Sequence, residues 1–265
     1  IWHPLSVTLS LLMLSGCTVT QLTQSAQETR LTRLTEELSQ KGDSTSVVML
    51  YERAAASMPD NPDILLALGN AQLRNGNPPA AEKTFRRVYN LRPEDPNAIL
   101  GLGYAALLRN NIERAYTLIS SSAPLVNTYI SYNLLGVTAT FKGNFLQAQQ
   151  AFSAAEALAP KNLEIKSNQA LAYALNNDIP SAIHHLSIVT ASPLAEPHHI
   201  RRQALILVLA GEDAQAEKLL QGMPKQEINA LLSQAKRIRD ISEPTERASA
   251  IGIMPTFTPN LNKNT

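Results

Sequence analysis

Apolar residues recur along most of this chain at the spacing of helices that bury one face, and turn residues interrupt the pattern at regular intervals. The segments Pro59–Pro62 and Pro93–Pro96 lie 34 residues apart, and each precedes an apolar run that ends in Leu-Gly. These pairs are Leu68-Gly69 and Leu102-Gly103, and a third pair, Leu135-Gly136, follows after 33 residues. Such a period predicts stacked helical hairpins.

Two further requirements of a helical hairpin recur in phase with this period. Antiparallel helices approach closely only where small residues face each other. Small residues stand at one place in each first helix and at one place in each second helix: Gly69, Gly103, Gly136, Ala170 and Ala204, then Ala81, Ala115, Ala148, Ala182 and Ala216. A chain that ends one helix and reverses needs a residue that tolerates the left-handed backbone conformation. Each copy has one: Gly42, Gly76, Asn110, Gly143, Asn177 and Gly211. The chain is therefore predicted to be all-α.

The repeat resembles the tetratricopeptide pattern, which has Leu-Gly early, Ala midway, an aromatic residue four positions later and Pro near its end. Residues 62–95 match this pattern at Leu68, Gly69, Ala81, Phe85 and Pro93, with Leu65 in place of Trp. Residues 129–162 match it at Tyr132, Leu135, Gly136, Ala148, Phe152 and Pro160. The resemblance implies an α-solenoid that serves as a protein-binding scaffold.

We place six repeats at 28–61, 62–95, 96–128, 129–162, 163–196 and 197–230. The first copy is atypical, because Thr35 and Val47 stand where small residues are expected. Apolar residues at helical spacing after the last hairpin predict a capping helix at 231–243. The prolines at 244, 255 and 259, among several Asn and Thr residues, predict a mostly disordered tail at 244–265.

The resemblance implies that the first helices line a concave groove, and grooves of this kind bind extended peptides or partner helices. The inward-facing side chains would include Asn70, Leu73, Arg74, Tyr104, Leu107, Leu108, Asn133, Val137, Phe141, Leu171, His198 and Arg201. Each apolar member could serve packing between neighbouring repeats instead. A clamp for a partner's terminal carboxylate, as some family members have, is not expected, because Leu66 and Leu100 occupy places that would need polar groups.

The first residues predict a membrane anchor rather than a membrane-spanning helix. Residues 5–14 are apolar with a few hydroxyls, whereas a bilayer requires roughly 20 apolar residues. The run ends in Leu14-Ser15-Gly16-Cys17, which resembles the lipobox of bacterial lipoproteins. That resemblance implies a signal peptide at 1–16 with a truncated charged region, lipid attachment at Cys17 and a spacer at 17–27. The alternative is a buried helix that ends in a small apolar cysteine.

Composition narrows the classes of function. Aromatic residues make up 5% of the chain beside abundant Ala and Leu, which favours packed helices over sheets. Lys and Arg number 23 against 22 Asp and Glu, so no strong field would attract nucleic acid. Cys17 is the single cysteine, which excludes an intramolecular disulfide and argues against a Cys-based metal site.

The sequence predicts no catalysis, cofactor, metal or small-molecule substrate. His184-His185 and His198-His199 are its histidine clusters, and a zinc site would require both pairs to converge with Glu196 or a similar residue. We expect instead that the first pair lies on an outer helix and that the second pair begins the next helix. A glycine-rich phosphate loop is missing from the sequence.

Lipoproteins with about six tetratricopeptide repeats resemble two groups of pilus-assembly factors. The length, lipobox, repeat array and Pro-bearing tail are most similar to the TadD-like lipoproteins of the Tad (Flp, tight adherence) pilus. The pilotins of type IV pili are the second group. Thr18 follows the cysteine where Asp would signal inner-membrane retention, which favours the outer membrane. Both resemblances imply a scaffold on the periplasmic face of that membrane that binds a secretin or another assembly component. A periplasmic adaptor for cell-wall enzymes or outer-membrane biogenesis is a third hypothesis.

Overall fold

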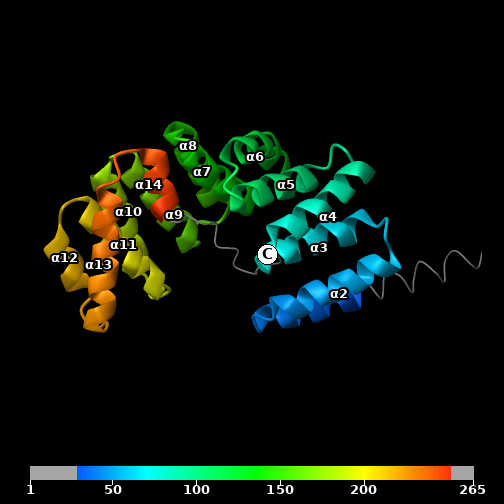
Figure 1. Cartoon of the computed structure of the whole chain (residues 1–265), viewed down its shortest axis with the longest axis horizontal. Coiled ribbons are helices and arrows are strands. Elements are labelled where there is room, and N and C mark those ends of the chain that lie inside the picture. The colour runs from blue at the N-terminus through cyan, green and yellow to red at the C-terminus, as the bar shows by residue number, and fades with distance from the viewer. Residues whose placement is uncertain (1–28, 252–265) are drawn as a thin grey trace, which may run out of the picture.

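The computed structural model describes residues 29–251, and every regular element in this range is a helix. The helices follow one another along an arch, from α2 at one end to α12 and α13 at the other (Figure 1). This arrangement confirms the all-α solenoid that the 34-residue period predicts.

A helix at residues 29–40 precedes α2 (Ser44–Ser57). Four hairpins follow, made of α3 (Pro62–Arg74) with α4 (Pro78–Leu91), α5 (Pro96–Leu108) with α6 (Ile112–Val126), α7 (Tyr129–Phe141) with α8 (Phe145–Leu158), and α9 (Leu163–Leu175) with α10 (Ile179–Thr190). The chain continues through α11 (Pro197–Leu209), the short α12 (Asp213–Leu219), α13 (Lys225–Arg239) and α14 (Pro244–Ile251).

The first helices of the hairpins form the inner layer of the arch. Each packs against the next along the series α3, α5, α7, α9 and α11. Within residues 29–251, the second helices α4, α6, α8, α10 and α12 make no such contact with one another. Helices are crowded on the concave side of a bent stack and spread on its convex side, so the first helices line the concave face.

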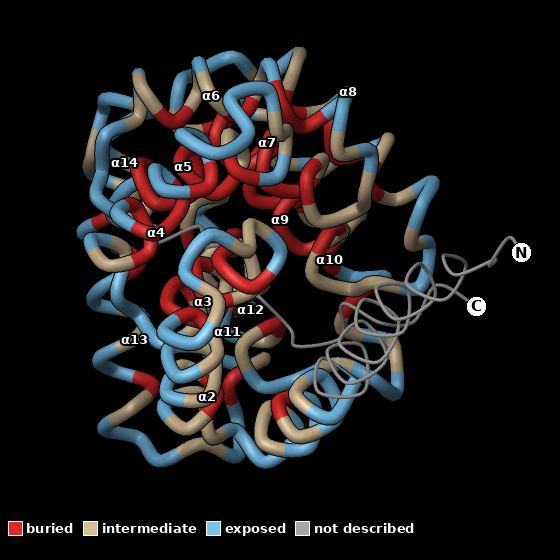
Figure 2. The backbone as a smooth tube through the Cα atoms, turned by 90° about the vertical axis from the view of Figure 1, so that its right-hand side faces the viewer, coloured by how far each residue is buried: buried red, intermediate tan, exposed pale blue. Residues whose placement is uncertain are grey.

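Small residues sit where the two helices of each hairpin cross. Gly69, Gly103 and Gly136 are buried, and so are the small residues of the second helices, Ala81, Ala115 and Ala148, which have no exposed surface. A Cβ added to Gly136 would lie 2.6 Å from the Phe152 ring, which shows how closely α7 and α8 approach. Buried residues accordingly concentrate where the hairpins meet (Figure 2).

The turns between first and second helices use the expected residues. Gly42, Gly76, Asn110, Gly143, Asn177 and Gly211 all have positive φ, between 58° and 84°. This confirms the six left-handed positions. Asn127 is also left-handed, with φ 52°, and ends α6.

The C-terminal part differs from the sequence prediction in two ways. The helix expected at 231–243 is α13, which begins earlier, at Lys225, because α12 ends at Leu219 and Gly222 turns the chain at φ 109°. Residues 244–251, expected in a mostly disordered tail, form α14 instead, since its proline lies at the first position, where a helix tolerates it. Residues 252–265 lie outside the described part.

Within residues 29–251, no helix has both the length and the hydropathy that crossing a bilayer requires. Cys17, the signal peptide and the spacer that the sequence predicts lie outside the described residues.

Candidate partner-binding surface

All twelve residues expected on the concave face lie on first helices, but they differ in exposure. Leu73, Tyr104, Leu107, Asn133, Val137 and Leu171 are buried. Asn70, Arg74, Leu108, Phe141 and His198 are half-buried, and Arg201 is exposed. Half of the set therefore packs the inner layer together, and the half-buried members and Arg201 are those that a partner can reach.

Asn133 is an example of an inward-facing residue with a structural role. Its Oδ1 accepts a hydrogen bond of 3.2 Å from Nδ2 of Asn168, and both side chains are buried. The bond joins α7 to α9. Asn168 is not among the residues predicted for this face, although it lies one repeat after Asn133 and therefore beside it in the stack.

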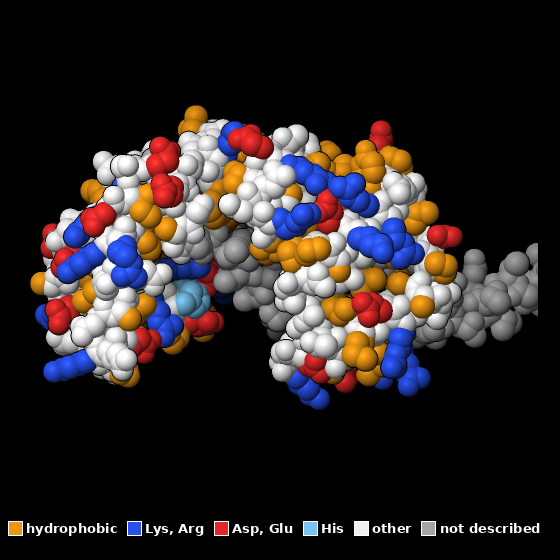
Figure 3. Space-filling view, in the orientation of Figure 1, with side chains coloured by type: hydrophobic (Ala, Val, Ile, Leu, Met, Phe, Trp, Pro, Cys, Tyr) orange, Lys and Arg blue, Asp and Glu red, His pale blue; other side chains and the backbone are white. Residues whose placement is uncertain are grey.

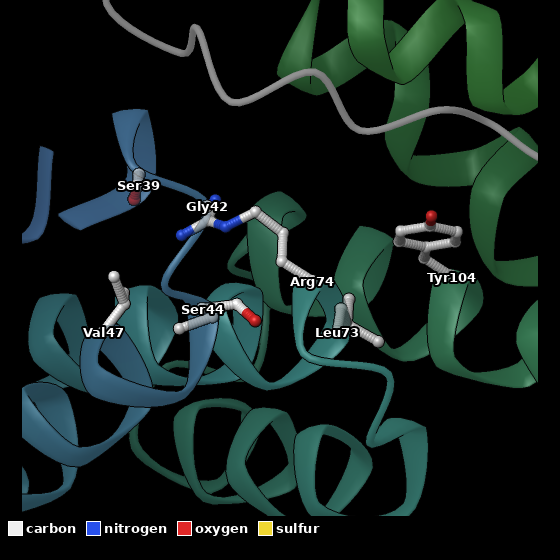
Figure 4. A pocket seen from close by; sticks show the side chains of 8 residues that line it. Ser39, Gly42, Ser44, Val47, Leu73, Arg74 and Tyr104 are labelled. Atoms are coloured by element: carbon white, nitrogen blue, oxygen red, sulfur yellow. The ribbon is translucent and has the colours of Figure 1, made fainter.

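A cavity of about 380 Å³ opens at the N-terminal end of the concave face. Its lining comes from the turn at Gly42 and from α2, α3 and α5, and includes Ser44, Leu73, Arg74 and Tyr104 (Figure 4). Arg74 extends from α3 toward the turn at Gly42 (Figure 4). Burial raises the pKa of the Tyr104 phenol, so this side chain stays neutral and can only donate or accept hydrogen bonds.

Arg74 has no counter-charge within the described part of the chain. No hydrogen bond or ion pair joins its guanidinium to another described residue. Burial lowers the pKa of Arg74, which means that the surroundings disfavour its positive charge. A desolvated cation without a partner is unfavourable, so a carboxylate or carbonyl group brought by a bound segment would stabilise it.

A second polar site lies farther along the concave face, where α9 meets α11. The Oε2 atom of Glu164 lies 2.9 Å from Nη1 of Arg202, and its Oε1 atom lies 2.8 Å from Nε2 of His199. The ring of His198 also contacts Oε1. Burial alone would raise the pKa of Glu164, but Arg202 and the two histidines outweigh it and lower the pKa. A hollow with a histidine beside acidic and basic side chains is visible in Figure 3.

Three ligand atoms of Glu164, His198 and His199 lie within 4.8 Å of one another, which raises the question of a metal ion. His199 Nδ1, however, accepts the backbone N–H of Glu196 at 2.9 Å, so the neutral ring carries its proton on Nε2. Arg202 already neutralises the carboxylate. Protonated Nε2 cannot ligate a metal, so this geometry fits an ion-pair cluster that fastens α11 to α9.

The zinc site considered from sequence would need both histidine pairs. His184 and His185 lie on α10, where His185 stacks on Tyr173 at 5.0 Å between ring centroids. The acidic side chain that contacts both His198 and His199 is Glu164, which was not among the residues considered from the sequence. Glu164 and His198 are 34 residues apart, one repeat, and that spacing is the signal that could have found the pair.

The fold and its concave face define a class, the helical-repeat scaffolds. Tetratricopeptide-repeat models match residues 38–90, 66–123 and 134–196, which together make up more than half of the chain. This chain therefore belongs to the tetratricopeptide repeat proteins. No curated protein matches it significantly in sequence.

Several solved structures share the fold at low sequence identity. PilW, a widely conserved type IV pilus biogenesis factor, has 17% identity and a TM-score of 0.66 over 77% of this chain and 97% of PilW. The pilF protein of Pseudomonas aeruginosa has 14% identity and a TM-score of 0.57 over 78% of this chain and 98% of that one. A tetratricopeptide repeat protein of Parabacteroides merdae has 15% identity and a TM-score of 0.60, over 86% and 94%.

Proposed function

We propose that this protein is a periplasmic scaffold, held on the outer membrane by a lipid at Cys17, that binds a component of a pilus-assembly apparatus. The observation that carries the proposal is the concave face, where half-buried polar side chains and buried apolar side chains line a cavity of about 380 Å³. The Arg74 guanidinium in this cavity, which has no acidic partner among residues 29–251, supports capture of a protein segment that supplies an acceptor group. The scaffold role requires no catalytic residue.

Two pilus systems are candidates. The lipobox and the repeat array resemble the TadD-like lipoproteins of the Tad (Flp) pilus, which is the first candidate. A type IV pilus pilotin is the second, and the observation that favours it is the fold shared with PilW and the pilF protein over nearly their whole length. In both systems the partner would be a secretin or another assembly component.

Partner capture tests this proposal. The full-length protein, its Arg74→Ser variant and its Arg87→Ser variant are used to capture partners from envelope extracts, with the products identified by mass spectrometry. Arg87 lies on the outer helix α4, is exposed and serves as the matched control. We expect the wild type and Arg87→Ser to retain a secretin and Arg74→Ser to lose most of it.

The captured secretin also separates the candidates, because it belongs either to a Tad system or to a type IV pilus. Capture of cell-wall or outer-membrane biogenesis enzymes instead would favour the adaptor hypothesis. Equal recovery of the secretin by all three proteins would show that the cavity at Arg74 is not the binding site.

The anchor is tested separately by fractionation. Cys17→Ser removes the only thiol that a lipid could modify. We expect this variant in the soluble periplasmic fraction and the wild type in the outer membrane, because several acyl chains are needed for stable anchoring. Unchanged membrane retention of the variant would refute lipid attachment at Cys17.

A further inference from the structure

The concave face is open at its N-terminal end but carries an additional helix over its centre. Helix α14 packs against α7 and α9, which are both first helices, and against α13. It therefore lies on the surface where a partner of a helical-repeat scaffold binds. The segment 240–243 is all that separates α14 from the end of α13.

The contact of α14 with this surface depends on few side chains. Ala248 has no exposed surface and belongs to the same buried cluster as Val137 of α7 and Leu171 of α9. Ile251 packs against that cluster and lines a cavity of about 220 Å³ together with residues of α11 and α13. Thr245, Glu246, Ser249 and Ala250 are exposed.

The hydrogen bonds of α14 orient this helix relative to α13 and do not attach it to α7 or α9. Arg247 Nε donates a hydrogen bond of 2.9 Å to the carbonyl of Ile241, just after α13, so this side chain holds the link and not α7 or α9. The methyl carbon of Thr245 lies 4.0 Å from the place where a Cβ of Gly143 would be, at the turn that follows α7.

The contact is accordingly weak. A helix of eight residues is not stable by itself in water, so α14 forms because it packs on the groove. Among residues 245–251, the one fully buried side chain is that of Ala248, and an alanine removes little apolar surface from water. A longer partner helix with larger apolar side chains would bury more of the same surface.

We propose that the inner surface of α7 and α9 is a binding site for a short amphipathic helix of a protein partner, and that α14 fills this site until the partner displaces it. The site accepts a small residue where Ala248 lies and a branched aliphatic residue three positions later, where Ile251 lies. This inference rests on the proposed function in one respect, namely that the concave face binds a protein.

The test uses the full chain and a fluorescein-labelled synthetic peptide with the sequence of residues 240–251. Ala248→Asp places a charge in the buried contact, so that α14 should leave the site on α7 and α9; we call this an opening variant. Ala250→Asp is the matched control, because the same substitution there falls on an exposed position of the same helix. Ser249→Pro is a second opening variant that breaks α14 without touching the buried cluster.

We expect saturable peptide binding to Ala248→Asp and to Ser249→Pro, at least about tenfold tighter than to the wild type or to Ala250→Asp, because the closed site is available only for a fraction of the time. A peptide that itself carries Ala248→Asp should not bind. Equal binding to all four proteins, or binding to none of them, would overturn the inference.

Hydrogen exchange on the same proteins shows whether the opening variants remain folded. Residues 244–251 should lose protection in both opening variants, while α7 and α9 keep most of theirs. Loss of protection throughout α7 and α9 would mean that α14 is a structural part of the array, which also overturns the inference.

The peptide-binding result and the secretin-capture result can be distinguished from each other. Peptide binding to the opened variants, with no secretin recovered by any protein, would support the helix-binding site and refute the pilus role. Secretin recovered equally by wild type, Ala248→Asp and Ala250→Asp would leave the scaffold role standing and show that the secretin does not use this site.

Discussion

At the scale of single residues, the array depends on aromatic rings that fit against glycines. The Phe85 ring lies between two first helices: a Cβ on Gly69 would be 2.7 Å from it, and a Cβ on Gly101 of the next repeat would be 2.5 Å from it. Phe85 itself has no exposed surface. One ring thus closes its own hairpin and also joins it to the following one.

Gly101→Ala should lower the free energy of unfolding by about 1 kcal/mol or more. The added methyl group would lie 2.5 Å from the Phe85 ring, so its overpacking cost falls toward the upper end of about 1–3 kcal/mol and exceeds the gain of up to about 1 kcal/mol from replacing glycine in a helix. Urea denaturation followed by circular dichroism measures the change. In the double variant Gly101→Ala/Phe85→Leu the two losses should not add, because the smaller side chain leaves room for the methyl group. Additive losses would contradict this explanation.

Glu82 is the residue-scale feature that makes stability depend on pH. Its carboxylate contacts Arg86 at 2.8 Å, Arg114 at 2.9 Å and Arg109 at 2.5 Å, and its side chain is only 10% exposed. The hydrogen bond from Arg86, together with Arg114 and Arg109, outweighs burial and lowers the pKa of Glu82 from 4.5 to about 2. A carboxyl group with a lowered pKa stabilises the fold above its unfolded pKa, and this stabilisation is lost as the pH falls from about 4.5 toward 2.

Glu82→Gln should therefore cost about 1–2 kcal/mol at pH 7, a value between those of exposed and buried ion pairs. The difference from wild type should shrink as the pH falls below about 4.5. Glu113→Gln is the control, because the Glu113 side chain is 76% exposed in its pair with Lys142. A difference between wild type and Glu82→Gln that stays constant down to pH 3 would contradict the assignment.

The sequence predicts the residues that recur in every repeat, but it does not predict those that join one repeat to the next. Gly69, Gly103 and Gly136 could be predicted because each recurs at the same place in its copy. Gly101 and Glu82 could not, since each depends on which side chain the neighbouring repeat brings within a few ångströms. The same holds for the concave face: the period placed Tyr104 and Val137 on first helices, but burial by neighbouring helices decides whether a partner can reach them.

At the scale of the helices, two consecutive residues determine the turn between the first and second helix of each hairpin. A left-handed residue ends the first helix, and the next residue caps the second helix through its side chain. The pairs with such a cap are Gly42-Asp43, Gly76-Asn77, Asn110-Asn111, Gly143-Asn144 and Asn177-Asp178. The sixth pair, Gly211-Glu212, lacks the side-chain cap bond, and α12 that follows has only 7 residues.

Asn111→Ala should therefore destabilise the protein by about 1 kcal/mol, because it removes the bond from the Arg114 amide to Asn111 Oδ1. Glu212→Ala should have almost no effect. Thermal denaturation of the two variants gives the comparison, and similar losses for both would mean that the caps do not limit stability.

The helix α14 could not be predicted from the local sequence of residues 244–251. Prolines among Asn and Thr indicate disorder when a segment is considered alone. Residues 244–251 are helical because the groove of α7 and α9, far away in sequence, accepts Ala248. Local composition carries no information about such a contact.

At the scale of the whole molecule, stability should vary along the arch. Apart from the contacts of α14 with α7 and α9, each hairpin in residues 29–251 contacts only its neighbours, so a repeat at an end has about half the packing surface of a central one. Hydrogen exchange measured by mass spectrometry should show the slowest exchange in α5 to α8 and the fastest in the helix at 29–40, in α12 and in α14. Uniform protection along the chain would instead indicate a single cooperative unit.

The short link between α13 and α14 sets a threshold for any competing helix. A tether of a few residues keeps α14 at an effective concentration on the order of millimolar beside its site. A partner helix present at about 1 µM must then bind roughly 1,000-fold more tightly than α14 does, or by about 4 kcal/mol, to occupy half of the molecules. The scaffold thus rejects weak apolar helices, and four linking residues confer a selectivity that the groove alone would lack.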